Sequence, residues 1–262
     1  MNIKLIVADM DGTLLNSKSE INPEFYPTFE RLKEKNILFA VASGRQYFNL
    51  LARFDELKND IVFMAENGSY VLYQNKQILL SSLDRQTSIK MIEKSRTLTH
   101  AYRILCGAKF AYIEQNSPEF ITQVEKYYAR YKIVDDLSQV DDDILKVTIC
   151  DLTGTKDNNA SAFAEFENDL LVAISGKFWL DISVKNANKG YAVKKTQEIF
   201  NISPEETMVF GDYLNDIQLM DSAFYSFAME NAHPEIKKIA RFVAKSNDEN
   251  GVVESIKKFV LS

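Results

Sequence analysis

The first part of the chain alternates short apolar runs of strand length with helical segments, and this alternation constrains the fold more than any other feature. The apolar runs occupy residues 3–8, 37–42 and 61–65. Such unbroken runs are typical of strands that are buried on both faces of a parallel sheet. They are separated by apolar residues at helical spacing from Phe25 to Leu32 and by a second helical segment over 46–57. The predicted order is therefore βαβαβ, and a hairpin follows over 69–80.

The texture of the sequence changes near residue 84 and again near residue 185. Between these positions helices mix with alternating strands, whereas the strand over 208–210 and its neighbouring helices resume the first pattern. We predict an α/β protein whose doubly wound, parallel-sheet, Rossmann-like core comprises residues 1–83 and 186–262. A separate α+β domain over 84–185 is expected to be inserted between these two parts.

Charge and composition narrow the classes of function. The net charge of −6, from 31 basic and 37 acidic residues, argues against a surface that neutralises nucleic-acid phosphates. Cys106 and Cys150 lie outside any CxxC spacing, which predicts buried thiols in a reducing compartment. The apolar run at the start is too short for a signal or membrane segment. We therefore expect a cytoplasmic protein that binds neither nucleic acid nor membrane.

Each of three apolar strands ends in a polar cluster. Asp9 and Asp11 follow the first strand, Ser43-Gly44-Arg45 follows the second, and Gly211-Asp212 follows the strand over 208–210. The carboxyl ends of parallel strands share one edge of the sheet, where open α/β folds bind their ligands. We therefore expect these clusters to converge, although they are far apart in the sequence.

Each charged residue also has a simpler interpretation. Asp9 and Asp11 lie two apart, which on a strand places both on one face, but two aspartates in an exposed turn are the commoner case. Asp212 could cap the helix that follows it. Asp212 and Asp216, at i and i+4, would share a helix face and repel each other unless a cation lies nearby. Lys189 starts a helix, where the dipole disfavours a positive charge, and a solvated lysine is its alternative.

If the clusters converge, the carboxylates that share one pocket are those of Asp9, Asp11, Asp212 and Asp216. Without compensation they would raise one another's pKa values, so a divalent cation is implied. Oxygen ligands without Cys or His favour Mg²⁺ over zinc, and the chain has only 2 histidines. The cation, a lysine, the Ser43 hydroxyl and backbone N–H groups at helix starts together suit a phosphate group.

Four short motifs occur in order along the chain. They are DMDGTL at 9–14, ASGR at 42–45, KG at 189–190 and GDYLND at 211–216. Together they resemble the haloacid dehalogenase superfamily, specifically its Cof-like sugar-phosphate phosphatases with a large α/β cap. The resemblance spans nearly the whole chain, and the segment over 84–185 lies where this subfamily carries its substrate-specificity cap. NG at 67–68 and MENA at 229–232 also look like recurring loops, although NG is more typical of a turn.

The resemblance implies a role in the reaction for three of these residues. Asp9 would attack phosphorus and form an aspartyl-phosphate. Asp11 would protonate the leaving alcohol and then activate water, which requires a higher pKa than that of Asp9. Lys189 would balance the charge on Asp9 and on the phosphate.

The resemblance also implies a set of binding groups. Mg²⁺ would be held by Asp9, the carbonyl oxygen of Asp11, and Asp212, and Asp216 would orient the ligands of the metal through water. The phosphate would be bound by Ser43, Gly44, Lys189 and Asn215. Thr13 and Arg45 are expected to support these residues, and Arg45 could also contact the substrate.

The expected function is thus that of a Mg²⁺-dependent phosphatase for a small phosphorylated metabolite, a sugar phosphate or a related phosphomonoester. Two departures leave the core reaction untouched: Glu230 replaces a small residue, and Asn188 precedes Lys189 where serine is usual. A phosphomutase of the same superfamily is an alternative, since the sequence does not say whether water or a second substrate takes the phosphoryl group. A phospho-acceptor regulatory protein is another, although such a module needs no inserted domain.

Overall fold

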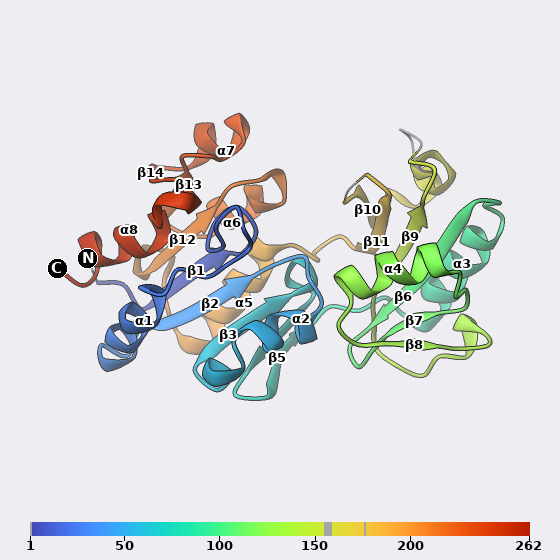
Figure 1. Cartoon of the computed structure of the whole chain (residues 1–262), viewed down its shortest axis with the longest axis horizontal. Helices are drawn as coiled ribbons and strands as arrows, with labels where there is room; N and C mark the ends of the chain where they lie inside the picture. The colour runs from blue at the N-terminus through green and yellow to red at the C-terminus, as the bar shows by residue number, and fades with distance from the viewer. Residues whose placement is uncertain (1, 155–158, 176) are drawn as a thin grey trace. The chain divides into compact units, whose positions relative to one another are not determined.

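A computed structural model describes residues 2–154, 159–175 and 177–262. The chain forms two compact units (Figure 1). The first, here named the core unit, comprises Met1–Leu79 and Asn188–Ser262. The second, the inserted unit, comprises Leu80–Ala187. The inserted domain expected over 84–185 falls within this second unit.

The core unit is built on an 8-stranded sheet in the order β14-β13-β12-β1-β2-β3-β4-β5. Its strands are β1 (Leu5–Asp9), β2 (Leu38–Ala42), β3 (Ile61–Ala65), β4 (Tyr70–Tyr73), β5 (Lys76–Leu80), β12 (Thr207–Gly211), β13 (Tyr225–Met229) and β14 (Phe242–Ala244). Neighbours from β14 to β3 are parallel, and β4 is antiparallel to β3. The chain runs from β1 to β2 and β3 on one side, while β12 to β14 lie on the other. The topological switch point is therefore between β1 and β12.

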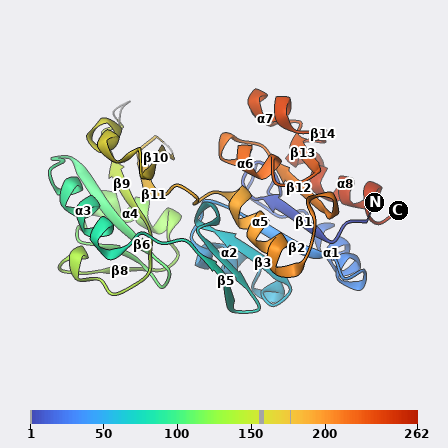
Figure 2. The ribbon, with the colours of Figure 1, turned by 180° about the vertical axis from the view of Figure 1, so that it is seen from behind.

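Helices cover both faces of this sheet, which explains why its central strands are apolar and buried. The helices are α1 (Phe25–Glu34), α2 (Tyr47–Arg53), α5 (Lys189–Phe200), α6 (Ile217–Met220), α7 (Pro234–Ile239) and α8 (Gly251–Phe259). Short 3₁₀ helices are η1 (Asp55–Leu57), η2 (Glu66–Gly68), η5 (Pro204–Glu206), η6 (Leu214–Asp216) and η7 (Asn247–Glu249). Figure 1 shows α1 and α2 in front of the sheet, and Figure 2, from behind, shows α5. Phe25 and Phe29 of α1 pack against Phe39 of β2, with ring centroids 5.2 and 6.0 Å apart.

The inserted unit has its own 6-stranded sheet, in the order β10-β11-β9-β6-β7-β8. The strands are β6 (Ala101–Gly107), β7 (Ala111–Ile113), β8 (Tyr131–Ile133), β9 (Ile144–Asp151), β10 (Leu170–Ile174) and β11 (Trp179–Val184), and the helices are α3 (Arg85–Arg96), α4 (Pro118–Tyr127), η3 (Leu137–Gln139) and η4 (Ala160–Phe166). Met91 of α3 joins an apolar cluster on the face of Leu105, and Phe120 of α4 joins another on the face of Ile104. The thiols of Cys106 and Cys150 are buried in this unit.

The α/β class and the doubly wound parallel sheet are confirmed. The differences lie in short elements. The edge strands β8 and β14, three residues each, carry too little periodicity to be predicted. The helix expected over 46–57 ends at Arg53 and is followed by η1. Among the described residues, no helix is both long and apolar enough to span a membrane.

Candidate active site

Three carboxylates meet at the carboxyl edge of the core sheet, beside the switch point. Asp9 ends β1, and Asp212 follows β12. Together with Asp216 they offer oxygen atoms that all lie within 4.8 Å of one another. The amino group of Lys189 contacts Oδ1 of Asp9 and lies 2.6 Å from Oδ1 of Asp216. Segments from opposite ends of the chain are therefore brought together around one buried lysine.

Lys189 is completely buried, at 0% exposure, so the alternative of a solvated lysine does not hold. It is the first residue of α5, where the preceding Asn188 accepts a hydrogen bond from the backbone N–H of Tyr191 at 2.9 Å. Asparagine caps helices as well as serine does, so this departure from the family pattern preserves the cap. The cap starts the helix at the point that directs Lys189 toward the acidic residues.

Asp216, rather than Asp212, closes the turn after β12. Its Oδ2 accepts the backbone N–H groups of Asp212 at 2.9 Å and Tyr213 at 3.2 Å. The Asp212 carboxylate instead accepts the Thr13 hydroxyl at 3.0 Å. The capping alternative for Asp212 is therefore wrong. The expectation of a shared helix face is wrong too, because Asp212 precedes η6 and α6 begins only at Ile217.

Gly12 lets the loop after β1 pass directly against Asp212. Its φ is 82°, and a Cβ at this position would lie 2.3 Å from Oδ2 of Asp212. A side chain could neither adopt this backbone conformation easily nor fit the space. The glycine of the DMDGTL motif is thus required by the closeness of the two loops.

Asp11 lies apart from the three clustered carboxylates. Its side chain is 51% exposed and pairs with Arg45, with Nε–Oδ2 at 2.8 Å and Nη2–Oδ1 at 2.7 Å. The argument that Asp9 and Asp11 share a strand face does not hold, because β1 ends at Asp9. Asp9 and Asp11 therefore differ in environment, because Asp9 is buried and Asp11 is half-exposed and paired with the Arg45 guanidinium.

A second group of polar residues lies at the ends of β2 and β3. Ser43, which is buried, follows β2, and its hydroxyl oxygen accepts the Arg45 N–H at 3.2 Å. Asn67 donates its backbone N–H to the Ser43 carbonyl at 2.9 Å and accepts from the Asn215 side chain at 3.2 Å. Gly44 runs so close that a Cβ there would lie 3.1 Å from the Asn67 Oδ1.

Asn67 was thus missed as a residue of this edge, because Asn-Gly was interpreted as turn chemistry. The turn does exist, since Asn67 has a φ of 54°. The signal that could have identified it is its position two residues after the buried strand β3, close to a strand end like the other polar clusters.

The cluster of three carboxylates and one lysine carries more negative than positive charge. Burial, together with Asp216 and Asp212, raises the pKa of Asp9 well above its usual range, although Lys189 opposes the change. Burial and Asp216 raise the pKa of Asp212 to about 6. Burial would lower the pKa of Lys189, but Asp216 and Asp9 outweigh it and raise that pKa. A single lysine does not neutralise three carboxylates, and this all-oxygen set suits a hard divalent cation.

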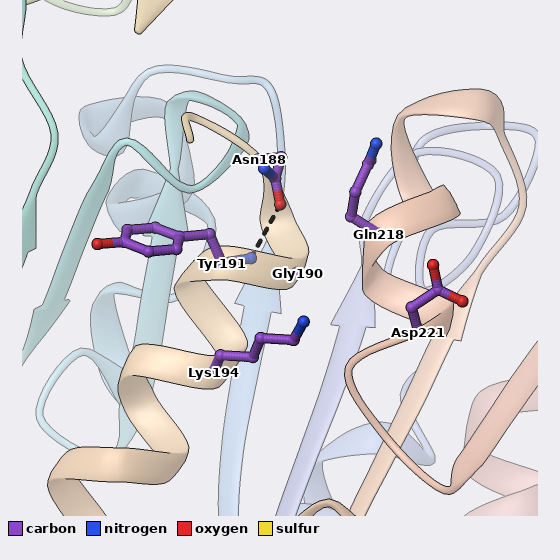
Figure 3. Close-up of a pocket in the computed structure, with 6 residues that line it drawn as sticks. All are labelled: Asn188, Gly190, Tyr191, Lys194, Gln218 and Asp221. Carbon is purple, nitrogen blue, oxygen red and sulfur yellow. Dashed lines mark hydrogen bonds between the residues drawn. The ribbon is translucent and has the colours of Figure 1, made fainter. Parts of the chain in front are cut away.

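A surface pocket of about 210 Å³ lies between α5 and α6 (Figure 3). It is lined by Asn188, Gly190, Tyr191, Lys194, Gln218 and Asp221. Gly190 allows the two helices to meet here, because a Cβ would lie 2.1 Å from the Gln218 carbonyl oxygen. None of the clustered carboxylates lines this pocket, so it is distinct from the acidic site.

The family described as haloacid dehalogenase-like hydrolase matches residues 6–256. A 5-amino-6-(5-phospho-D-ribitylamino)uracil phosphatase of Escherichia coli (strain K12) is 33% identical over 261 residues, which cover 98% of this chain and 96% of that protein. Another 5-amino-6-(5-phospho-D-ribitylamino)uracil phosphatase, from Bacillus subtilis (strain 168), is 26% identical over 275 residues, which cover 95% of this chain and 96% of that protein.

Solved structures agree with this likeness. A haloacid dehalogenase-like hydrolase from Bacteroides thetaiotaomicron matches with a TM-score of 0.88 at 25% identity, covering 98% of this chain and 99% of the other. The likeness therefore includes both units, which a phospho-acceptor regulatory module would not require. The chain belongs to the haloacid dehalogenase-like hydrolase family, in its Cof-like subclass, and is a phosphatase that acts on phosphomonoesters.

Proposed function

We propose that this phosphatase depends on Mg²⁺ and hydrolyses the phosphomonoester of a sugar or sugar alcohol through an aspartyl-phosphate on Asp9. The observation that carries the proposal is the buried contact of Lys189 with Asp9 and Asp216, beside Asp212. It leaves more negative than positive charge at a switch point, where open α/β folds bind ligands. Such a site favours a cation and the phosphate that accompanies it.

The residues present fit a magnesium ion. Asp9, Asp212 and the carbonyl oxygen of Asp11 would hold it, and Asp216 would orient its water ligands. When bound, Mg²⁺ supplies positive charge that stabilises the transferring phosphoryl group. The Thr13 hydroxyl, 3.0 Å from Oδ1 of Asp212, fixes the orientation of that carboxylate.

Asp9 carries out the covalent step in this proposal. One of its carboxylate oxygens attacks phosphorus, and the bond between phosphorus and the ester oxygen breaks. Lys189 contacts Oδ1 of Asp9, so it orients the carboxylate and opposes the rise in pKa that burial causes. Water then attacks phosphorus, which releases inorganic phosphate and restores the Asp9 carboxylate.

Asp11 moves the protons. It donates one to the departing alkoxide in the first step and accepts one from the attacking water in the second. In the structure both of its carboxylate oxygens contact Arg45. The pair must therefore separate before Asp11 can act, and the half-exposed position of Asp11 permits such a movement.

The phosphoryl oxygens are proposed to bind along β2 and η6. Ser43 would donate its hydroxyl, Gly44 would offer its backbone, and Asn215 would donate from its amide. Asn67 holds the Asn215 amide at 3.2 Å and thereby sets its direction. Lys189 contributes the positive charge of the site.

We further propose the domain roles that the resemblance implies. Residues 1–83 and 186–262 form the catalytic domain, and residues 84–185 form the cap that selects the substrate. Support for the substrate class comes from the E. coli and B. subtilis relatives, whose names specify a phosphorylated ribityl compound. A ribityl phosphate is a phosphomonoester of a sugar alcohol.

The test is phosphate release from a panel of phosphorylated metabolites. The panel would include 5-amino-6-(5-phospho-D-ribitylamino)uracil, ribose, ribitol and hexose phosphates, with Mg²⁺ and after exhaustive chelation. We expect Mg²⁺-dependent release, fastest for a ribityl or sugar phosphate. Full activity after chelation would contradict the metal dependence, and transfer of phosphate to a second organic acceptor would favour the phosphomutase.

A further inference from the structure

The loop after β13 holds the loop after β1 through one side chain, that of Asn231. Its Nδ2 donates to the Gly12 carbonyl oxygen at 2.8 Å, and its Oδ1 accepts the Asn247 backbone N–H at 3.0 Å. Asn247 in turn donates from its side chain to the Leu15 carbonyl at 2.9 Å. Asn231 belongs to the MENA motif, to which the proposed reaction gives no role. It bridges three loops at the carboxyl edge of the sheet.

The hydrogen bond to Gly12 holds the loop after β1 where it packs closely against Asp212. The Gly12 backbone passes against Asp212, where a Cβ would lie 2.3 Å from the Asp212 Oδ2. The same loop also holds the other side of this contact, because the His233 backbone N–H donates to the Asp212 carbonyl at 2.8 Å. Asn231 and His233 therefore fix the Gly12 peptide and Asp212 relative to each other.

We propose that Asn231 is a positioning residue that sets the distance between the loop after Asp9 and Asp212, and thereby the affinity of the site for a divalent cation. The inference rests on the proposed function, in which Asp9 and Asp212 hold the metal on opposite sides of the switch point. Asn231 contacts no clustered carboxylate and acts through Gly12. Only a side chain with a donor and an acceptor at this reach makes both bonds.

The experiment measures metal binding in the absence of substrate. Mn²⁺ binding to the full chain would be followed by electron paramagnetic resonance and Mg²⁺ binding by calorimetry, for the wild type, Asn231→Ala and Asn231→Ser. Asn59→Asp is the control, since Asn59 is an exposed asparagine that precedes the opposite, amino end of β3. We expect about a tenfold loss of cation affinity in both Asn231 variants, the size typical of residues that orient metal ligands.

A merely structural role would show a different pattern. In that case the metal-free melting temperature would fall while cation affinity in the folded variants stayed at the wild-type value. We expect instead that cation affinity falls while the metal-free melting temperature stays near the wild-type value. At saturating Mg²⁺ kcat should be largely restored. Wild-type affinity in either folded variant would overturn it.

A measurement on the wild type keeps the inference testable if neither variant folds. Mg²⁺ should slow amide hydrogen exchange in residues 229–233 together with residues 10–13. Slowing of 10–13 alone would overturn the inference. Failure of the proposed function is recognised separately. A protein whose Mn²⁺ affinity depends on Asn231 but which hydrolyses no phosphomonoester contradicts only that function.

Discussion

Both units bury charged side chains, but the balance of positive and negative charge around them differs. In the inserted unit, Lys146 of β9 pairs with Asp181 of β11 at 3.1 Å, and Thr148 donates to the second Asp181 oxygen at 2.6 Å. In this pair one buried positive charge faces one negative charge within the sheet. In the core unit, Lys189 faces the carboxylates of Asp9, Asp212 and Asp216 at the ends of strands. The pair in the inserted unit balances its own charge, whereas three carboxylates share one lysine in the core unit and leave room for a cation.

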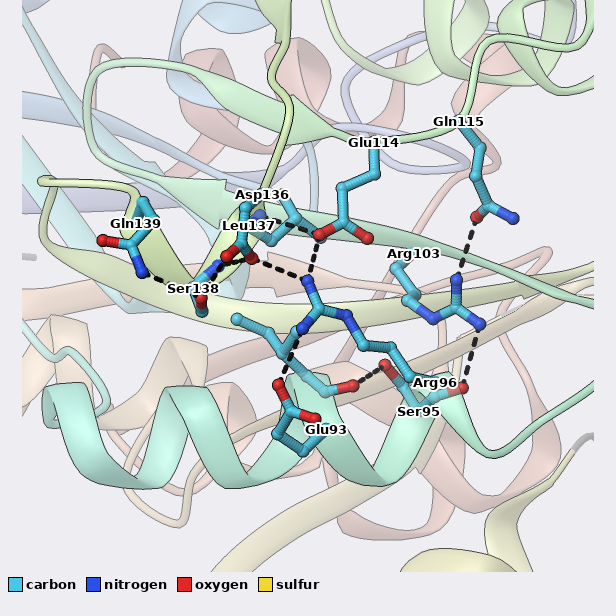
Figure 4. Close-up of polar contacts among 11 residues, drawn as sticks. Glu93, Ser95, Arg96, Arg103, Glu114, Gln115, Asp136, Leu137, Ser138 and Gln139 are labelled. Carbon is cyan, nitrogen blue, oxygen red and sulfur yellow. Dashed lines mark hydrogen bonds and ion pairs between the residues drawn. The ribbon is translucent and has the colours of Figure 1, made fainter.

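The pKa values of the acidic residues show the same contrast. In the inserted unit, hydrogen bonds from Arg96 and Ser138 lower the pKa of Asp136 to about 2 (Figure 4). In the core unit, burial and Asp216 raise the pKa of Asp212 to about 6. The lowered pKa of Asp136, which is partly exposed, reflects hydrogen bonds that are already in place. The raised pKa of Asp212 reflects burial and the neighbouring Asp216 carboxylate.

The largest effect is expected from Asp9→Asn. The substitution removes the proposed nucleophile, so phosphate release should fall by on the order of 10⁶-fold. The metal-free melting temperature should not fall, because the change removes a buried carboxylate whose pKa is raised. Steady-state kinetics and thermal unfolding of the same preparation check both statements. Turnover within tenfold of the wild type would remove Asp9 from the mechanism.

Asp11→Asn should have a smaller effect that depends on the leaving group. Loss of proton transfer should cost roughly 10²–10⁴-fold on a sugar phosphate. An aryl phosphate, whose phenolate departs without a proton, should lose much less. The ratio of kcat values on the two substrates is the measurement. Equal losses on both, with metal binding and fold retained, would show that Asp11 is not the general acid.

Asp181→Asn tests the other side of the comparison. It removes the Asp181 charge from its pair with Lys146, whose side chains are only 9% and 13% exposed, so the free energy of unfolding should fall by about 3 kcal/mol. The double variant Lys146→Met/Asp181→Leu should recover most of this loss. Urea unfolding measures both. A double variant as unstable as the single one would mean that the pair does more than balance its own charges.

The smallest effect concerns pH. Because the pKa of Asp212 is about 6 in the folded protein, above its ordinary value, the folded state binds protons more tightly than the unfolded state. Stability of the metal-free protein should therefore fall as the pH rises from 4 to 6. Mg²⁺ should raise the melting temperature by a few degrees at pH 7.5 and by less at pH 5, where protons compete for Asp212. An equal rise at both values would contradict the raised pKa.

The sequence predicts the parts of the site that depend on local pattern. Asp9, Ser43 and Asp212 could be placed on one edge because each follows an apolar strand, and parallel topology brings such ends together. The complete burial of Lys189 could not be predicted, because helix periodicity alone does not show what packs over the first turn. The same holds for the fold, whose long strands were predicted but whose three-residue edge strands were not.

The contacts between loops could not be predicted from the sequence, for a physical reason. Three such contacts join segments that follow different strands. They are the ion pair of Asp11 with Arg45, the hydrogen bond of Asn215 to Asn67 and the hydrogen bond of Asn231 to Gly12. Their formation depends on the exact separation of neighbouring strand ends and on loop conformations, which no local periodicity encodes. Polar clusters at strand ends therefore predict where the active site lies. The structure is needed to show which side chains contact one another there.

The most direct test of the account is to trap the phosphoryl group on the protein. Asp11→Asn, which should hydrolyse the intermediate slowly, would be mixed with an aryl phosphate and Mg²⁺, and then treated with borohydride, which reduces an acyl phosphate to an alcohol. We predict that peptide mass spectrometry finds this reduction at Asp9, only when Mg²⁺ is present, and not in Asp9→Asn/Asp11→Asn. Turnover with Asp9 unmodified, or with the modification at another residue, would contradict the account.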